Sequence, residues 1–209
     1  MKCEALNKRL NKKINMEKVS YALGLSIGNN LLSSGIRDLN IEKFTQAIQD
    51  VLGGVQPEMT YDEAKTTLDK FFRDLADKIN AQNIQVGKEF LENNAKKEGV
   101  VCLPSGLQYQ VLQVGNGKKP GATDKVRCHY HGMLLDGTVF DSSVNRGEPA
   151  EFGVNQVIQG WVEALQLMQE GAKWRLFIPS DMAYGARGAG QSIPPHATLI
   201  FDVELIKVL

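Results

Sequence analysis

The histidines of this chain carry only part of the pattern that a metal site needs. His129 and His131 are two residues apart in a segment that alternates as a strand does, so both imidazoles point to one face. A zinc site needs three or four ligands, and the remaining histidine, His196, is far away in sequence between Pro195 and Ala197. We therefore predict neither a metal nor any other cofactor.

Nucleotide-binding and nucleophile patterns are also incomplete. Gly185, Gly188 and Gly190 form a glycine-rich segment, but the spacing is not G-x-G-x-x-G and no parallel βαβ pattern surrounds it. We expect a loop there. No serine or cysteine has the turn motif and histidine base of a catalytic nucleophile. Asp141 follows Phe140 at the end of an expected strand, where a turn or cap role competes with a role in a site.

Trp161 is the residue whose type and position most favour a binding site. It follows Gly160 at the start of a short amphipathic helix, on which Leu165 and Met168 lie four and seven residues further on. An indole in the first turn of such a helix can form the floor of a pocket instead of filling a layer of the core. The stretch Val157-Ile158-Gln159-Gly160-Trp161 therefore predicts an apolar pocket.

The composition is that of an ordinary globular protein. Of 209 residues, 43% are apolar and 23% are charged, which fits one or two domains. Lys+Arg and Asp+Glu both number 24, so the formal charge is zero, and neither nucleic acid nor a membrane surface is an expected partner. A basic run at the N-terminus is interpreted as a solvated tail; it contains Lys2, Lys8, Arg9, Lys12 and Lys13.

The cysteines and the hydropathy pattern bear on location. Cys3, Cys102 and Cys128 are odd in number and far apart, which favours free thiols in a reducing compartment. No long apolar run follows the basic start, so the sequence predicts no signal-peptide core and no transmembrane helix. We expect a cytoplasmic protein, or a periplasmic one if a leader has been removed.

The first half of the chain has helical periodicity. Two short apolar stripes precede residue 53, and Gly53-Gly54 is a typical helix stop. The stripes consist of Val19, Ala22, Leu23, Ile27, Asn30 and Leu31, and of Ile41, Phe44, Ile48, Val51 and Leu52. Two such helices bury little apolar surface alone, so we expect them to dock on another copy or another domain.

A long helix is predicted to follow. Thr60 and Glu63 match a capping box, and the helical pattern then continues from Tyr61 to Glu98. The apolar stripe is dense only in the first part of this segment, where it contains Ala64, Leu68, Phe71, Phe72, Leu75 and Ile79. We expect the first half to be buried and the second half to be a solvated rod that can bend at Gly87.

After Gly99 the apolar period changes from 3.6 to 2, which predicts half-buried antiparallel strands. The alternating sets are Leu107, Tyr109 and Val111; Val126, Cys128 and Tyr130; Trp174, Leu176 and Ile178; and Leu199, Phe201, Val203 and Leu205. Asp136-Gly137 predicts a two-residue hairpin turn. One helix, from Trp161 to Gly171, is expected in this half, so the fold class is α+β, with a sheet wrapped over a short helix.

Several motifs carry a resemblance to a known family. They are VRCHYHGML (Val126–Leu134), DGTVFDSS (Asp136–Ser143), VIQGW (Val157–Trp161), AYG (Ala183–Gly185) and IPPHATL (Ile193–Leu199). Residues 99–209 closely resemble the FKBP-type peptidyl-prolyl cis-trans isomerases. The preceding half resembles the N-terminal dimerisation module of the Mip-like bacterial FKBPs. The implied domains are a helical dimerisation domain (1–59), a long linker helix (60–98) and an isomerase domain (99–209).

The resemblance implies a half-barrel sheet around one helix, with a role for each matching residue. Trp161 would be the pocket floor, and the Ile158 N–H and the Tyr184 hydroxyl would bind substrate carbonyls. Asp141 would lie near the twisting amide, paired with Arg146. The walls would be Tyr130, Phe140, Phe152, Val157, Ile158, Ile193 and Phe201. The catalytic set would be Tyr130, Phe140, Asp141, Tyr184 and Phe201, and the substrate-binding set Trp161, Val157, Ile158, Phe152, Arg146 and Ile193.

Three positions depart from the commonest pattern of the family. Ala150 stands where a Phe is frequent, Gln156 where a Glu is frequent, and Ala189 where a bulkier residue or a His is common. These departures bear on macrolide affinity and on the residues preferred around the proline. They do not bear on the fold.

An isomerase of this kind suits a pocket with few reactive groups. Rotation about an X–Pro bond has a barrier of about 18–20 kcal/mol because amide resonance must be broken, and no bond is cut. Two functions are compatible with the residues. One is a dimeric isomerase with chaperone activity that acts on unfolded or proline-containing polypeptides and binds the macrolide inhibitors of the family. The other is a holdase-type binding module in which isomerisation is secondary.

Overall fold

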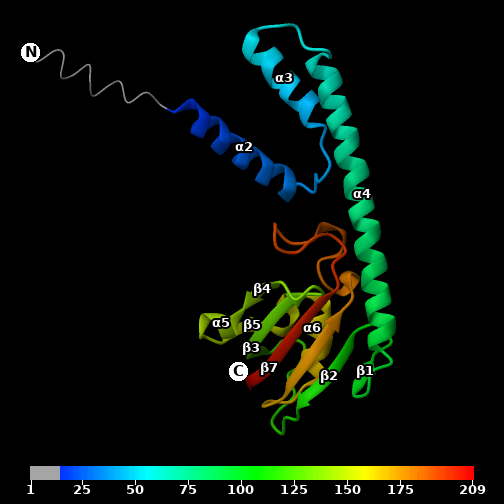
Figure 1. The fold of residues 1–209 in the computed structure, drawn as a ribbon. Helices are drawn as coiled ribbons and strands as arrows, with labels where there is room; N and C mark the ends of the chain where they lie inside the picture. Colours follow the sequence, from blue (N-terminus) through cyan, green and yellow to red (C-terminus); the bar gives the residue numbers. More distant parts are fainter. Residues whose placement is uncertain (1–14) are drawn as a thin grey trace, which may run out of the picture. The chain divides into compact units, whose positions relative to one another are not determined.

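A computed structural model describes residues 15–209 (Figure 1). The chain forms two compact units, which divide between Leu75 and Ala76. Cys3 and the basic run of the first 13 residues lie outside the described residues.

The first unit begins with two capped helices. Helix α2 spans Met16–Ser33, and the Asn15 side chain accepts hydrogen bonds from the N–H groups of Glu17 and Lys18. Helix α3 spans Ile41–Gly53 and ends where Gly54 adopts φ 65°, a left-handed conformation that glycine reaches without steric cost. The predicted stop at Gly53-Gly54 is confirmed.

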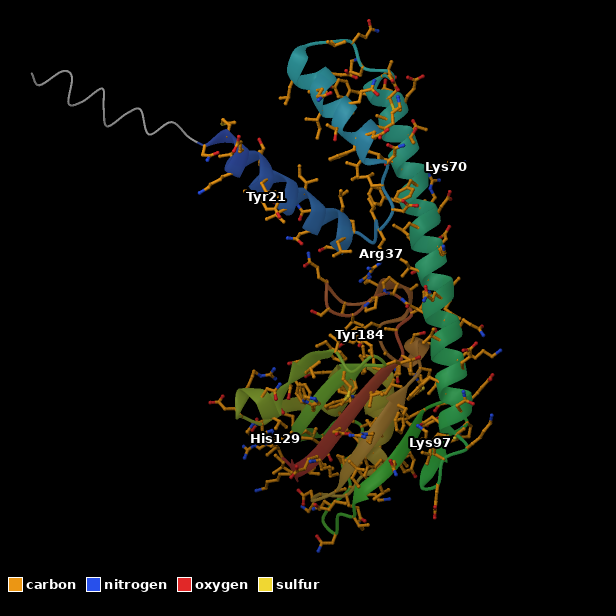
Figure 2. All side chains as sticks on the ribbon, viewed as in Figure 1. Tyr21, Arg37, Lys70, Lys97, His129 and Tyr184 are labelled. Carbon is orange, nitrogen blue, oxygen red and sulfur yellow. The ribbon has the colours of Figure 1, made fainter. Side chains whose placement is uncertain are left out.

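Neither α2 nor α3 contains a buried residue. Tyr21 on α2, labelled in Figure 2, is 72% exposed. Leu52 on α3 is 83% exposed. The apolar stripes of these helices therefore remain largely exposed to solvent in a single chain. This agrees with the expectation that the helical half needs a further surface to dock on.

Helix α4 spans Tyr61–Asn94 and starts with the predicted capping box. The Thr60 N–H donates to the Glu63 carboxylate (2.8 Å), and the Glu63 N–H donates to the Thr60 hydroxyl (3.2 Å). At 1.5 Å per residue the helix is about 51 Å long. It ends four residues before the predicted Glu98.

The burial of α4 is the reverse of the prediction. Phe71 and Phe72, in the first half, are 43% and 42% exposed, whereas Gly87 and Asn94, in the second half, are buried. The second half is not a solvated rod, because the Asn94 amide donates to Gln108 (3.0 Å) and Gly87 packs closely against Thr198. Gly87 is a packing position and not a bend.

The second unit contains one seven-stranded antiparallel sheet. The strands are β1 (Val100–Cys102), β2 (Gln108–Gln113), β3 (Lys125–Leu134), β4 (Val139–Ser142), β5 (Ala150–Gly153), β6 (Lys173–Ile178) and β7 (Leu199–Val208). Their order is β1-β2-β6-β7-β3-β4, and β5 pairs with the first part of β3 (Figure 1). The α+β class is confirmed.

The core lies between this sheet and helix α6, which spans Gln159–Leu167. The predicted inward residues of β3, β6 and β7 are all buried. On β2 the alternation fails, because Val111 is 42% exposed. Helix α6 stops before the predicted Gly171, since Met168 is already extended (ψ 154°) while its side chain stays in the core.

Two short features differ from the sequence predictions. A four-residue helix, α5 (Ser143–Arg146), follows β4 and is capped by the Ser142 side chain. It was missed because four residues show no periodicity. The hairpin between β3 and β4 is present, but its turn is centred on Leu135-Asp136, and Gly137 follows with φ 85°. It is therefore a bulged turn and not the two-residue turn predicted.

Candidate active site

The predicted site residues gather around one open cavity of about 580 Å³. Every one of them except Arg146 lines it. The lining residues are Tyr130, Phe140, Asp141, Phe152, Gln156, Val157, Ile158, Trp161, Tyr184, Ala189, Ser192, Ile193 and Phe201. This volume is in the range of small-ligand sites.

Trp161 lies at the bottom of a group of perpendicular aromatic rings. It is 4% exposed, and the rings of Tyr130, Phe152 and Phe201 meet it edge-on, with centroids 5.5, 5.7 and 5.3 Å away. Phe140 in turn meets Phe201 edge-on at 5.4 Å. Edge-to-face pairs of this kind fix ring orientation. The floor and walls are therefore held in place before any ligand enters.

Two glycines make room for these rings. A Cβ atom on Gly132 of β3 would lie 2.7 Å from ring atoms of both Phe140 and Phe201. A Cβ atom on Gly160 would lie 2.5 Å from Ile178, so this glycine brings the start of α6 close to β6. Glycine is required at both places because of close approach, and not because of backbone conformation.

A polar group of three side chains forms one edge of the cavity. The Tyr130 hydroxyl donates to the Asp141 carboxylate (2.6 Å) and accepts from the Arg146 guanidinium (2.7 Å). Arg146 also pairs with Asp141. Arg146 contacts both groups from α5 and is not among the residues that line the cavity, so it helps to orient the Tyr130 hydroxyl and the Asp141 carboxylate. A direct contact of Arg146 with substrate stays a prediction.

Two further hydrogen-bond donors belong to residues that line the cavity, Ile158 and Tyr184. Ile158 is the N-cap of α6, and within residues 15–209 its N–H has no acceptor. Tyr184 is 40% exposed and lies in the segment between β6 and β7 (Figure 2); in the same residue range its hydroxyl takes part in no hydrogen bond. An N–H at a helix N-terminus is a good partner for a carbonyl oxygen.

The chain is similar to known proteins over nearly its whole length. Residues 116–206 match the sequence model of the family described as FKBP-type peptidyl-prolyl cis-trans isomerase. Residues 16–111 match the domain amino-terminal to such isomerases. The chain is 50% identical over 196 residues to the FKBP-type 22 kDa peptidyl-prolyl cis-trans isomerase of Escherichia coli, covering 92% of this chain and 95% of that protein.

The chain belongs to the FKBP-type peptidyl-prolyl cis-trans isomerases.

Other FKBP-type proteins extend the similarity. The chain is 45% identical to the outer membrane protein MIP of Legionella longbeachae, over 92% of this chain and 85% of that one. The crystal structure of FkpA from Escherichia coli matches with a TM-score of 0.76 at 37% identity, covering 94% of this chain and 97% of that chain. Both comparisons include the helical first half as well as the sheet.

Of the three residues at which this chain departs from the commonest FKBP pattern, two line the cavity and one does not. Gln156 and Ala189 line the cavity, whereas Ala150 is on β5, partly buried against the core and outside the lining. Ser192 also lines the cavity and was not predicted. It lies in an irregular loop, so no periodicity could have indicated it.

The two strand histidines hydrogen-bond to serines. His129 Nδ1 lies 3.0 Å from the Ser143 hydroxyl, and His131 Nδ1 lies 2.9 Å from the Ser142 hydroxyl. In the part of the chain that the structure describes, no group of three His, Cys, Asp or Glu side chains is arranged to hold a metal ion. Nor does any helix there have both the length and the apolar content needed to cross a membrane.

The polar edge sets the protonation states of the site. Burial acts to raise the pKa of Asp141, but the hydrogen bond from Tyr130 and the charge of Arg146 outweigh it and hold that pKa below its ordinary value. Burial and the neighbouring Asp141 raise the pKa of the Tyr130 hydroxyl. Burial, followed by the charge of Asp141, raises the pKa of Tyr184. At neutral pH the site therefore holds one carboxylate and two protonated phenols.

The lowered pKa of Asp141 predicts an acid-tolerant activity that depends on Arg146. Because the pKa of Asp141 is lower in the folded chain than the value of about 3.9 in an unfolded chain, its ionised form stabilises the fold at any pH above that value. This stabilisation is lost as the pH falls through the lower, folded pKa. The wild-type kcat/KM should therefore be flat from pH 8 to about pH 5. In Arg146→Leu the acid decline should begin at higher pH, with about a 2–3-fold lower ratio of activity at pH 4 to activity at pH 7.

The matched control is Arg127→Leu, which removes another arginine that pairs with a carboxylate, Glu151, outside the cavity lining. Its pH profile should follow that of the wild type when measured with a protease-free NMR exchange assay. Identical profiles for Arg146→Leu and wild type would show that Arg146 does not set the ionisation of Asp141.

Proposed function

We propose that the cavity around Trp161 is the site at which this chain catalyses rotation about X–Pro peptide bonds. The observation that carries this proposal is the set of perpendicular aromatic rings around Trp161. The same cavity is lined by Asp141 and by two residues, Ile158 and Tyr184, whose N–H and hydroxyl have no hydrogen-bond partner within residues 15–209. The proline ring would lie on the indole. The carbonyl groups on either side would accept from the Ile158 N–H and the Tyr184 hydroxyl.

The mechanism follows from what rotation does to the amide. The twisted amide has lost conjugation and is less polar than the planar amide, so an apolar cavity stabilises it relative to water. Fixed hydrogen bonds and a carboxylate that fit the twisted geometry add to this preference. A reduction of about 5–7 kcal/mol in the barrier gives a 10⁴–10⁵-fold acceleration. We assign most of it to desolvation and shape and a minor part to Asp141.

The test of this function is the isomerisation rate of a short X–Pro peptide with the full-length chain. We expect concentration-dependent catalysis, measured by NMR exchange or by a protease-coupled assay. If the well-folded wild-type chain does not catalyse the reaction, the isomerase function is wrong. In that case the holdase function becomes the better explanation, with Gln156 and Ala189 as the first residues to revert to the commoner family types.

We further propose that the helices of the first unit form a homodimer. Leu25 and Leu32 of α2 are 54% and 51% exposed and line an open apolar hollow that also includes Gly24 and Gly28. Among the described residues, a Cβ atom on Gly24 or Gly28 would meet no atom within 4 Å beyond its chain neighbours and the backbone of its own helix, so another backbone can approach closely there. A second copy of the same helix pair would cover these faces.

We expect the wild type to have a dimeric mass at micromolar concentration and Leu25→Glu to be largely monomeric. The reason is that an unpaired carboxylate would be buried in the apolar contact. Sedimentation equilibrium would measure the mass. The control Lys18→Glu introduces the same side chain on α2 outside the hollow and should stay dimeric. A monomeric wild type would contradict the proposal.

The domain boundaries proposed are 1–59 for dimerisation, 60–98 for the linker helix and 99–209 for the isomerase domain. The compact second unit, however, starts at Ala76. A solved isomerase structure from Pseudomonas syringae covers 62% of this chain and 95% of its own, at 43% identity and a TM-score of 0.58. A folded unit of about this length therefore exists among the relatives.

A chain that starts at Ala76 should separate the isomerase from the chaperone. It should retain the wild-type rate on short peptides, because the cavity is complete within it. On an unfolded protein it should be at least about 10-fold less effective, because two cavities on one dimer raise the effective concentration of a second binding step. Equal activity on both substrates would contradict the chaperone role of the dimer.

Macrolide inhibitors of the FKBP family are proposed to bind over Trp161, with an affinity that depends on Gln156 and Ala189. The location proposed is the cytoplasm, with the periplasm as the alternative. The similarity to a Legionella longbeachae protein named for the outer membrane favours testing both compartments by cell fractionation.

A further inference from the structure

The second half of α4 contacts the segment that forms one wall of the cavity. The Asn83 side-chain amide donates to the Pro195 carbonyl at 2.8 Å. One turn further along, Gly87 is buried, and a Cβ atom there would lie 2.4 Å from the Thr198 hydroxyl oxygen. Only glycine lets the helix approach this closely. The helix therefore contacts the segment on both sides of His196 and Ala197.

The same segment is closed on itself by backbone hydrogen bonds. The His196 N–H donates to the Gly185 carbonyl (2.9 Å), next to Tyr184. Ala189 and Ile193 exchange two hydrogen bonds, of 2.8 and 3.1 Å. Tyr184, Ala189 and Ile193 all line the cavity. The position of this wall therefore depends on where the His196 N–H holds Gly185.

His196 has an unusual backbone conformation. Its φ is 57°, and among residues 15–209 it is the only residue other than glycine with a positive φ. Such a conformation persists when the surrounding structure holds it. The carbonyl that Asn83 binds belongs to the Pro195–His196 peptide, whose orientation defines φ of His196. The Asn83 amide is thus placed to hold the conformation on which the closure at Gly185 depends.

We propose that Asn83 is a positioning residue for isomerisation. Through the Pro195 carbonyl and His196 it sets the position of the wall that carries Tyr184 and Ile193. This inference rests on the proposed function of the cavity, and it makes the second half of α4 part of the catalytic unit. A shortened chain that starts at Gly99 would therefore lack Asn83, and with it a contact that positions the site, as well as the linker helix.

The test compares Asn83→Ala and Asn83→Asp with the wild type in the full-length chain. Aspartate keeps the size of the side chain but has no N–H to donate. Both variants should lower kcat/KM on a short X–Pro peptide by about 5–10-fold. Amide hydrogen exchange in residues 185–198 should become about 10-fold faster, whereas the unfolding midpoint seen by tryptophan fluorescence should stay close to that of the wild type. Both tryptophans, Trp161 and Trp174, report on the second unit.

Two control variants separate positioning from general stability. Gln85→Ala removes an amide from the same helix, one that bonds to Glu89 (2.6 Å) and not to the loop, and it should behave as wild type. Phe90→Leu weakens the contact of α4 with Phe177, where the ring centroids are 5.9 Å apart. It should lower the unfolding midpoint but leave loop exchange and kcat/KM unchanged.

The outcomes distinguish this inference from the proposed function. If the Asn83 variants lower only the midpoint, as Phe90→Leu does, Asn83 is purely structural and the inference is overturned. Wild-type behaviour of the Asn83 variants in all three measurements overturns it as well. If instead Trp161→Ala keeps full activity, the proposed function of the cavity fails, whatever Asn83 does.

Discussion

Replacing Trp161 by alanine is expected to lower kcat/KM for a short X–Pro peptide by at least about 50-fold. The indole is the floor on which the proline ring would rest, and it also orients the rings of Tyr130, Phe152 and Phe201. Its loss opens the cavity to water, so the apolar surroundings that favour the twisted amide disappear. A 50-fold loss corresponds to about 2.3 kcal/mol of the barrier reduction.

The chain offers a matched control for this variant. Trp174 on β6 is also buried and stacks on Tyr109, with centroids 4.1 Å apart and an interplanar angle of 7°, but it does not line the cavity. Both Trp→Ala changes should destabilise the second unit, by about 3–5 kcal/mol. Rates are therefore compared per folded molecule, with the folded fraction taken from circular dichroism. If both variants lose the same activity per folded molecule, the indole of Trp161 has no special role in catalysis.

The second large effect is expected at Phe140. Phe140→Ala should lower kcat/KM by about 10–30-fold, because the ring forms a wall of the cavity and supports Phe201. Asp141→Asn, at the neighbouring position, should lower it by only about 3-fold. The reason is that the carboxylate is partly exposed to solvent and already paired with Tyr130 and Arg146, so its electrostatic effect on the twisted amide is weak.

Together, Phe140→Ala and Asp141→Asn measure how much of the barrier reduction comes from desolvation and shape and how much from electrostatic stabilisation. Stopped-flow or NMR rates on the same peptide give both values under one set of conditions. A large loss in Asp141→Asn with an intact Phe140→Ala would show that electrostatic stabilisation dominates over desolvation and shape. Asn is used here because it preserves the size of the side chain and changes mainly its charge.

The pocket was predictable from sequence to an unusual degree. The position of Trp161 in the first turn of α6 and the alternation of β3, β6 and β7 are local patterns, and they determined which residues face inward. The motif resemblance then assigned the walls. The capping box at Thr60 and the helix stop at Gly54 were predictable for the same reason, since each depends on residues within one turn.

Other features were decided by contacts between segments far apart in sequence. The sequence could not show that Arg146 bonds to the Tyr130 hydroxyl, because that contact depends on a four-residue helix after β4. It also could not show that Ser192 lines the cavity, since Ser192 lies in an irregular loop that is closed by backbone hydrogen bonds within residues 185–196. Neither position has a periodic signal.

Helix α4 shows the difference most clearly. Its apolar stripe is dense before Ile79 and sparse afterwards, which predicted burial of the first half. The helix instead docks through its second half, where Asn83, Gly87 and Asn94 contact loop and sheet and the Phe90 ring packs near that of Phe177. Sequence by itself determined the family, the inward faces and the pocket residues, because these follow from local periodicity and motif spacing. Only the tertiary structure decided which part of α4 belongs to the catalytic unit, because an amide or a glycine shows its role only through the partner it meets.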